Sequence, residues 1–230
     1  MNDFVSFSAF FGVVISLASY FLGMSLKKRI KSPLCSPLLI SIILTILFLI
    51  ITKTEVSAYR ASADIITWFL TPATVSLALP LYLEIEKLKK NWKAVVLGIL
   101  SGVLSSLVTI LLLSILFSLS HKEYVSILPK SITTAIAMGL SEEMGGFVSL
   151  TVATISITGI WGSIVAPFVF KVFHINAPIA KGVALGTSSH AIGTAKAMEM
   201  GETEGAFSSL SIVVAGIMTV ILSIFFQYLH

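Results

Sequence analysis

Charged residues and cysteines are scarce in this chain. Only 11% of its 230 residues are charged, and Cys35 is the single cysteine, so no intramolecular disulfide is possible. The lysines flank apolar runs and do not gather on one basic face, which argues against nucleic acid as a partner. Met1–Asp3 lacks the basic start of a secretory signal peptide, so no cleaved leader is expected. We also expect no metal ion and no cofactor.

What the chain has in abundance is apolar sequence. Hydrophobic residues make up 56% of it and form runs close to the ~20 residues that a membrane-spanning helix needs. The runs are Phe4–Leu26, Leu38–Thr52, Ala63–Leu83, Ala94–Leu119, Phe147–Phe170, Pro178–Met198 and Phe207–Leu229. A further segment, Ile127–Leu140, is too short to span comfortably. The pattern predicts an all-α polytopic membrane protein, with residues 1–230 in one integral membrane domain.

The chain also shows signs of an internal repeat. A shift of about 115 positions pairs Leu70–Thr74 with Leu185–Ser189, and Glu84 with Glu199. Apolar runs, interrupted segments and charged loops then follow in the same order in both halves. We therefore expect repeat halves at 1–115 and 116–230. The alternative is chance similarity between apolar segments.

The charged loops predict the topology. Lys27–Lys31 and Lys87–Lys93 are basic, which places them on the cytoplasmic side. Their counterparts, Glu142–Glu143 and Glu199–Glu204, contain no lysine or arginine and are expected outside. The second half is then inverted, as in many secondary transporters. We favour seven spans plus a re-entrant half-helix over eight spans, because the former puts Lys171 inside.

The most informative stretch is Gly186–Lys196, where three hydroxyls and an imidazole precede a further threonine and a lysine inside an apolar run. Polar groups in a membrane segment are costly, so they usually face a cavity, a substrate path or another protein segment. Glycines and hydroxyls also allow a helix to break at membrane depth and to hold a ligand. The predicted helix breaks are Gly186, Gly193, Pro72 and Pro80.

Two broken helices that meet near the midplane would aim their N-termini at an anion. Pro129 is expected in the first turn of a helix, with hydroxyls close behind it and Lys130 able to add a charge. The predicted substrate-binding residues are Thr74, Ser131, Thr133, Thr134, Ser188, Ser189, His190, Gly193, Thr194 and Lys196. His190 and Glu142 are the candidates for coupling transport to an ion, because His190 can titrate.

Each of these features also has a simpler interpretation. Prolines in membrane helices are often plain kinks, and serine or threonine hydroxyls often bond back to the preceding turn. Lys196 can extend to an interface, and the glutamates of Glu199–Glu204 fit a solvated loop. No enzyme is expected, because no acidic group accompanies Ser188, Ser189 and His190 to orient the imidazole.

Three ordered motifs resemble the LrgB/CidB family. They are Pro129–Thr134 through Gly145–Gly146, Gly186–Ala195, and Leu70–Thr74 through Pro80–Tyr82. The resemblance covers nearly the whole chain. One departure is Ala135, where family members often have proline; the neighbouring hydroxyls are intact.

The resemblance implies two functions. Bacterial members are described as antiholin-like or holin-like regulators of murein hydrolase activity and cell lysis, acting with a smaller LrgA/CidA-type membrane protein. Other members are implicated in uptake of small carboxylates such as pyruvate, and the similar plant plastid protein moves glycolate and glycerate. This chain lacks the extra N-terminal LrgA-like part of the plastid protein, so we expect any such function to come from a separate subunit.

The convergent polar groups favour the transport function. We expect a secondary carrier of small monocarboxylates in the bacterial cytoplasmic membrane, driven by a proton or sodium gradient. It is expected to contact lipid and to form a homo-oligomer. The alternative is a regulatory or pore-forming membrane protein that controls lysis through its partner, a role that requires no substrate site.

Overall fold

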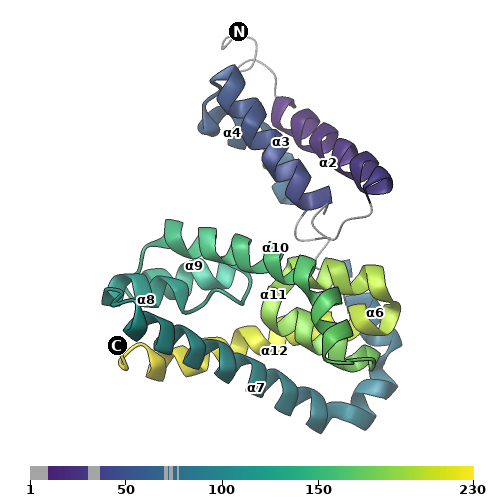
Figure 1. The fold of residues 1–230 in the computed structure, drawn as a ribbon, viewed down its shortest axis with the longest axis vertical. Coiled ribbons are helices and arrows are strands. Elements are labelled where there is room, and N and C mark those ends of the chain that lie inside the picture. Colours follow the sequence, from purple (N-terminus) through teal and green to yellow (C-terminus); the bar gives the residue numbers. More distant parts are fainter. Residues whose placement is uncertain (1–9, 31–36, 70–71, 73–74, 77) are drawn as a thin grey trace. The chain divides into compact units, whose positions relative to one another are not determined.

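The computed structural model describes residues 10–30, 37–69, 72, 75–76 and 78–230, and in these ranges the regular structure is helical (Figure 1). The chain divides into two compact units, Met1–Ser76 and Leu77–His230. We call them unit 1 and unit 2. The expected repeat boundary at position 115 lies inside a helix of unit 2, so the units differ from the expected halves, and the repeat stays a prediction.

Unit 1 contains α2 (Phe11–Arg29), α3 (Pro37–Thr52) and α4 (Val56–Trp68). Helix α2 packs against both of the others. A side chain at Gly12 would collide with the backbone of α4, and the Gly12 N–H donates to Ser62 Oγ at 2.9 Å. The missing side chain therefore lets α2 and α4 approach closely.

Unit 2 contains the remaining helices. They are α6 (Ala78–Leu83), α7 (Ile85–Leu116), α8 (His121–Ile127), α9 (Thr134–Glu143), α10 (Val148–Val172), α11 (Pro178–Met200) and α12 (Glu202–Phe226). Helices α11 and α12 are joined at Gly201 and pack against each other, and α7 packs against both. Helix α10 packs against α11 and also against the two short helices α8 and α9 (Figure 1).

The core of unit 2 follows from the pattern of α7. Val95, Ile99, Val103 and Leu107 recur every four residues and are buried, as expected for the inner face of a helix. The outer face is also apolar; Leu112, for example, is 61% exposed. A helix that is hydrophobic all round is typical of a membrane span.

Three described helices are long and apolar enough to cross a membrane: α7, α10 and α12. Helix α3 is apolar but shorter. The prediction of an all-α protein is therefore confirmed for the described residues. The number of spans, the re-entrant segment and the inverted topology stay predictions.

The expected run Ala63–Leu83 is not one helix. Helix α4 ends at Trp68, and α6 begins at Ala78. Pro80 lies in α6, but Leu77 just before that helix is undescribed and Val75 and Ser76 are helical, so the role of Pro80 as a break stays a prediction. Undescribed residues flank Pro72 on both sides, and its role as a break stays a prediction.

The short segment Ile127–Leu140 is also divided. Helix α8 ends at Ile127, Pro129 lies in the turn that follows, and α9 begins at Thr134 with Thr133 as its N-cap. The expectation that Pro129 begins a helix was wrong. Because proline has no N–H and its ring clashes with the preceding turn, it ends α8 instead.

Candidate functional site

Helix α11 is interrupted near its middle. Ser189 has φ −132° and ψ 15°, and His190 has φ 42° and ψ −136°, so neither residue is helical. Positive φ in a residue with a side chain costs about 1–3 kcal/mol and persists only where the surroundings hold it. The break therefore lies at His190, inside the stretch Gly186–Lys196 where we expected an interruption, and not at Gly186 or Gly193, whose backbone stays helical.

Small residues on α10 make room for this break. An added Cβ at Gly159 would lie 2.7 Å from the imidazole of His190, and one at Gly162 would collide with Ser189. His190 Nε2 lies 3.1 Å from the Ile155 carbonyl oxygen. A carbonyl only accepts hydrogen bonds, so Nε2 carries the proton and donates it. The imidazole is thus fixed against α10.

Hydroxyls of α11 and α12 complete the contacts around the break. Thr194 Oγ1 donates to the His190 carbonyl at 3.1 Å and lies 2.8 Å from Ser208 Oγ. Because the single Thr194 proton serves the carbonyl, the Ser208 hydroxyl donates to Thr194. We refer to Ser189, His190, Thr194 and Ser208 as the break network.

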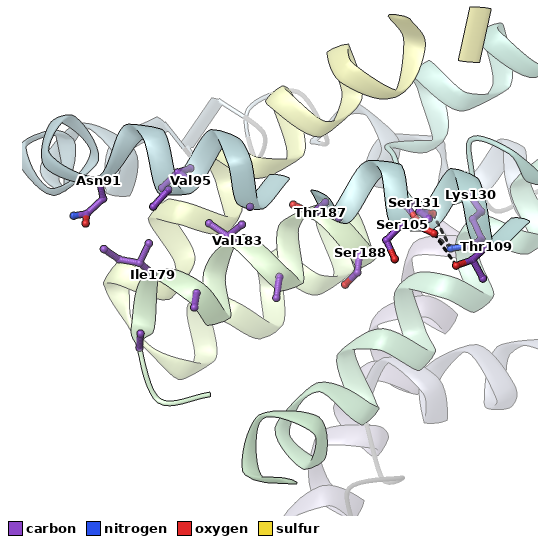
Figure 2. A pocket seen from close by; sticks show the side chains of 17 residues that line it. Asn91, Val95, Ser105, Thr109, Lys130, Ser131, Ile179, Val183, Thr187 and Ser188 are labelled. Atoms are coloured by element: carbon purple, nitrogen blue, oxygen red, sulfur yellow. Dashed lines mark hydrogen bonds between the residues drawn. The ribbon is translucent and has the colours of Figure 1, made fainter. Parts of the chain in front are cut away.

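A cavity of about 770 Å³ lies between α7 and α11. An added Cβ at Gly98 would lie 3.5 Å from Val183, and one at Gly102 would lie 2.8 Å from Thr187, so the two helices run side by side in the same direction. Figure 2 shows polar groups gathered at one end of the cavity, around Lys130. The polar lining residues at this end are Ser105, Ser106, Thr109, Lys130, Ser131, Thr187 and Ser188.

Lys130 is the cationic group of this cavity and lies in the turn before α9. Its Nζ donates to Ser131 Oγ at 3.1 Å and to Ser106 Oγ at 3.3 Å. No carboxylate among the described residues pairs with it within 4.0 Å. The hydroxyl of Thr187 is buried and has no hydrogen-bond partner in the described part of the chain. We refer to Ser106, Lys130, Ser131 and Thr187 as the cavity cluster.

Such a cluster is suited to binding an anion. A partly buried ammonium group without a carboxylate partner is costly, and a bound carboxylate would relieve that cost. Ser106 Oγ and Ser131 Oγ lie 3.2 Å apart, so one donates to the other; the remaining hydroxyl of the pair and that of Thr187 can each donate to a carboxylate oxygen. Among the described residues, no group of three or more histidine, cysteine or acidic side chains is placed to hold a metal ion.

The predicted substrate-binding residues fall into separate places. Ser131 and Ser188 line the cavity. The others among the described residues do not line it: Ser189, His190, Gly193 and Thr194 lie at or near the break, Thr133 and Thr134 at the start of α9, and Lys196 near the end of α11. Thr74 lies outside the described residues.

Two charged residues of the prediction are also accounted for. Lys196 Nζ pairs with Glu199 Oε2 at 2.8 Å, so its charge is compensated within α11 and it is not part of the cavity. Glu142 is exposed in the last turn of α9. Its coupling role stays a prediction.

Helix α7 supplies cavity residues that the sequence analysis missed, among them Ser106 and Thr109. The signal was present in the spacing. Gly98, Gly102 and Ser105 recur every three to four residues on a long apolar helix, which places them on one face. A stripe of small and hydroxyl residues on such a helix indicates either close packing or a polar cavity. Here the glycines pack close to α11 and the serine lines the cavity.

The fold and the site define a helical membrane protein with a polar cavity beside an interrupted helix. The pattern of the LrgB-like family matches residues 16–229. The chain is 39% identical over 215 residues to the antiholin-like protein LrgB of Bacillus subtilis strain 168, covering 93% of each. It is 36% identical over 213 residues to proteins of that name from Bacillus mycoides strain KBAB4 and Bacillus cereus strain B4264, covering 92% of this chain and 93% of theirs.

This chain therefore belongs to the LrgB family, and the family predicted from the three sequence motifs is confirmed. It is a membrane protein of that bacterial family with several apolar helices. No solved structure matches the chain.

Proposed function

We propose that this chain is an antiholin-like protein of the bacterial cytoplasmic membrane. The supporting observation is the name of its relatives, one of which is 39% identical over 93% of this chain. These names favour the lysis-regulating alternative over the carrier that the sequence analysis preferred. In this role the protein would restrain murein hydrolase activity together with a small LrgA/CidA-type membrane protein.

The rate of cell lysis tests this function. Cells lacking the protein are compared with cells that express it from a plasmid, and the fall in culture turbidity after a detergent challenge is followed. An antiholin-like protein restrains lysis, so turbidity should fall faster without it. The same comparison in cells without the small partner shows whether the effect needs that partner. Equal lysis rates with and without this chain would contradict the function.

A second candidate function is the secondary carrier of small monocarboxylates, and the cavity cluster favours it. Lys130, Ser106 and Ser131 form a cationic, hydroxyl-rich pocket, a feature that a pore-forming or regulatory role does not require. In this proposal Lys130 and the hydroxyls of Ser131 and Ser188 contact the carboxylate. Ser188 Oγ lies 3.0 Å from Ser189 Oγ, which connects the cavity to the break network.

Flux through the purified protein distinguishes the two candidates. Liposomes containing the protein are supplied with labelled pyruvate or glycolate, and leakage of an unrelated dye is measured in parallel. Saturable uptake without dye leakage would support the carrier. Dye leakage would support a pore, and the absence of both would leave the regulatory function as the supported one.

Proton coupling of such a carrier would pass through His190. The imidazole is 4% exposed and does not line the cavity, so any influence on a ligand acts through Ser189 and Ser188. Replacing His190 with glutamine keeps a hydrogen-bond donor but removes the titrating group. We expect His190→Gln to lose the pH dependence of uptake. An unaltered pH profile would show that His190 is only structural.

No enzymatic activity is part of either proposal. His190 Nε2 is occupied by the Ile155 carbonyl, and the hydroxyls of Ser188 and Ser189 contact each other. A serine nucleophile requires a base within hydrogen-bond reach and a third group that orients the base.

A further inference from the structure

Apart from Asn91, the polar residues that line the cavity of unit 2 lie at one end. Away from Lys130, its walls are formed by Ala94, Val95 and Gly98 of α7 and by Ile179, Ala180 and Val183 of α11. Figure 2 shows Val95, Ile179 and Val183 together on one side and the labelled hydroxyls with Lys130 on the other. The cavity thus combines a cationic end with an apolar trough.

The cavity is also much larger than a small monocarboxylate. Pyruvate has six non-hydrogen atoms, which occupy roughly 180 Å³ if each takes the ~30 Å³ share of a water molecule in the liquid. The cavity measures about 770 Å³, so such a ligand fills about a quarter of it. Its lining extends along α7 from Thr109 to Asn91, about 27 Å at ~1.5 Å per residue. Cavities of this size hold ligands as large as typical drugs.

The charges along this length give a bound anion one orientation. Lys130 has no carboxylate partner among the described residues. Near the opposite end, Lys87 Nζ is paired with Glu84 Oε2 at 2.8 Å and also contacts Thr203. Asn91, which closes that end, donates its side-chain amide to the Lys87 carbonyl at 2.8 Å. Among the described residues that line the cavity, Lys130 is therefore the only cation.

We propose that this cavity binds monocarboxylic acids with a linear hydrocarbon tail, with the carboxylate at Lys130 and the tail between α7 and α11. This inference rests on the anion site of the second candidate function and extends it from small carboxylates to amphiphilic ones. The tail covers the exposed side chains of Ala94 and Ala180 and removes apolar surface from water.

The dependence of affinity on chain length tests this proposal. Butanoate, hexanoate and octanoate are titrated calorimetrically into the full chain in lipid nanodiscs, with empty nanodiscs as the blank. Each buried methylene should raise affinity by about fourfold at full burial. The four additional methylenes of octanoate give about 250-fold at full burial, and partial burial should still leave octanoate bound at least about tenfold more tightly than butanoate. Octanol has the same tail length and no charge, and it should bind at least about tenfold more weakly than octanoate.

Substitutions in the apolar trough distinguish the contribution of the hydrocarbon tail to affinity from that of the carboxylate. The double variant Ala94→Leu/Ala180→Leu fills the trough, so octanoate affinity should fall to that of butanoate while butanoate affinity is unchanged. Retained butanoate binding also shows that the variant is folded. The matched control is Ala195→Leu, an exposed alanine on α11 that does not line the cavity, and it should change neither affinity.

The outcomes distinguish this inference from the function on which it rests. Equal affinity for all three acids, or equal binding of octanol and octanoate, would overturn the amphiphile proposal while short carboxylates still bound. Loss of octanoate binding in Ala195→Leu as well would also overturn it, because the effect would not depend on the trough. Failure of every carboxylate to bind the unmodified chain would contradict the anion site itself.

Discussion

In the break network of unit 2, hydroxyls and an imidazole donate to one another and to backbone carbonyls, whereas in the cavity cluster an ammonium group meets only hydroxyls. His190 bonds to Ile155, and Thr194 bonds to the His190 carbonyl and to Ser208. Lys130 contacts Ser106 and Ser131 and has no described carboxylate partner.

This difference distinguishes residues that stabilise the fold from residues that can bind a ligand. Polar groups that satisfy one another fix a strained backbone and leave nothing for a ligand. Polar groups with unused capacity beside a cavity are a candidate binding site. Substitutions in the break network should therefore change stability, and substitutions in the cavity cluster should change affinity.

The largest expected loss of stability comes from Gly159, which faces the imidazole of His190. The Cβ of Gly159→Ala would lie 2.7 Å from the ring and force the break to move. Overpacking of this kind costs about 1–3 kcal/mol in the free energy of unfolding. Gly139→Ala is the control, because nothing lies within 4 Å of its added Cβ, and it should instead stabilise α9 by about 0.5–1 kcal/mol. Unfolding in mixed SDS and detergent micelles measures both; equal changes would show that the contact with His190 is unimportant.

A smaller loss is expected at Thr194. Thr194→Val keeps the shape of the side chain and removes its bonds to the His190 carbonyl and Ser208. Hydrogen bonds between membrane helices contribute about 0.6 kcal/mol on average and up to about 1.7 kcal/mol. Thr154→Val is the control, because the Thr154 hydroxyl bonds only to carbonyls of its own helix. If the two variants unfold alike, the bond between α11 and α12 contributes nothing of its own.

The position of the break shows how much of the interruption of α11 could be predicted from the sequence. A histidine among hydroxyls and glycines in an apolar run predicted an interruption of α11, and His190 is non-helical. The glycines were assigned the wrong role. Gly186 and Gly193 stay helical and serve close packing instead, since an added Cβ would collide with the Ser208 carbonyl at Gly186 and with the Leu185 carbonyl at Gly193. Sequence shows that glycine is small, but only the packing shows whether the chain uses its size or its flexibility.

The cavity was less predictable than the break. Ser131 and Ser188 could be predicted because they lie in dense polar motifs. The contribution of α7 was missed because a stripe of small and hydroxyl residues also fits plain helix packing, and the contact of Ser106 with Lys130 is a tertiary one. Lys196 was placed in the site on charge alone, although Glu199 on the next turn of the same helix compensates it.

The smallest expected change in stability is at Thr187 of the cavity cluster. Its buried hydroxyl has no described partner, so Thr187→Val should leave the free energy of unfolding unchanged or raise it by a few tenths of a kcal/mol. Affinity for a carboxylate should fall about threefold, because one donor is lost. Unfolding and calorimetric titration of the same preparation check both. A destabilised variant with full affinity would show that Thr187 stabilises the fold, and it would contradict the proposed difference between the cavity cluster and the break network.

Carboxylate binding by the Lys130→Met variant tests most directly whether the cavity cluster is the binding site of unit 2. Methionine has nearly the length of lysine and no charge, and a hydrogen bond to a charged group contributes about 1.5–3 kcal/mol. Calorimetric titration should therefore show affinity about 10-fold to 100-fold weaker than in the unmodified chain. The free energy of unfolding should not fall, because the variant removes a costly unpaired charge. Lys196→Met, which removes a lysine that Glu199 already compensates, should bind as the unmodified chain does. Equal affinity in Lys130→Met and the unmodified chain would contradict the assignment.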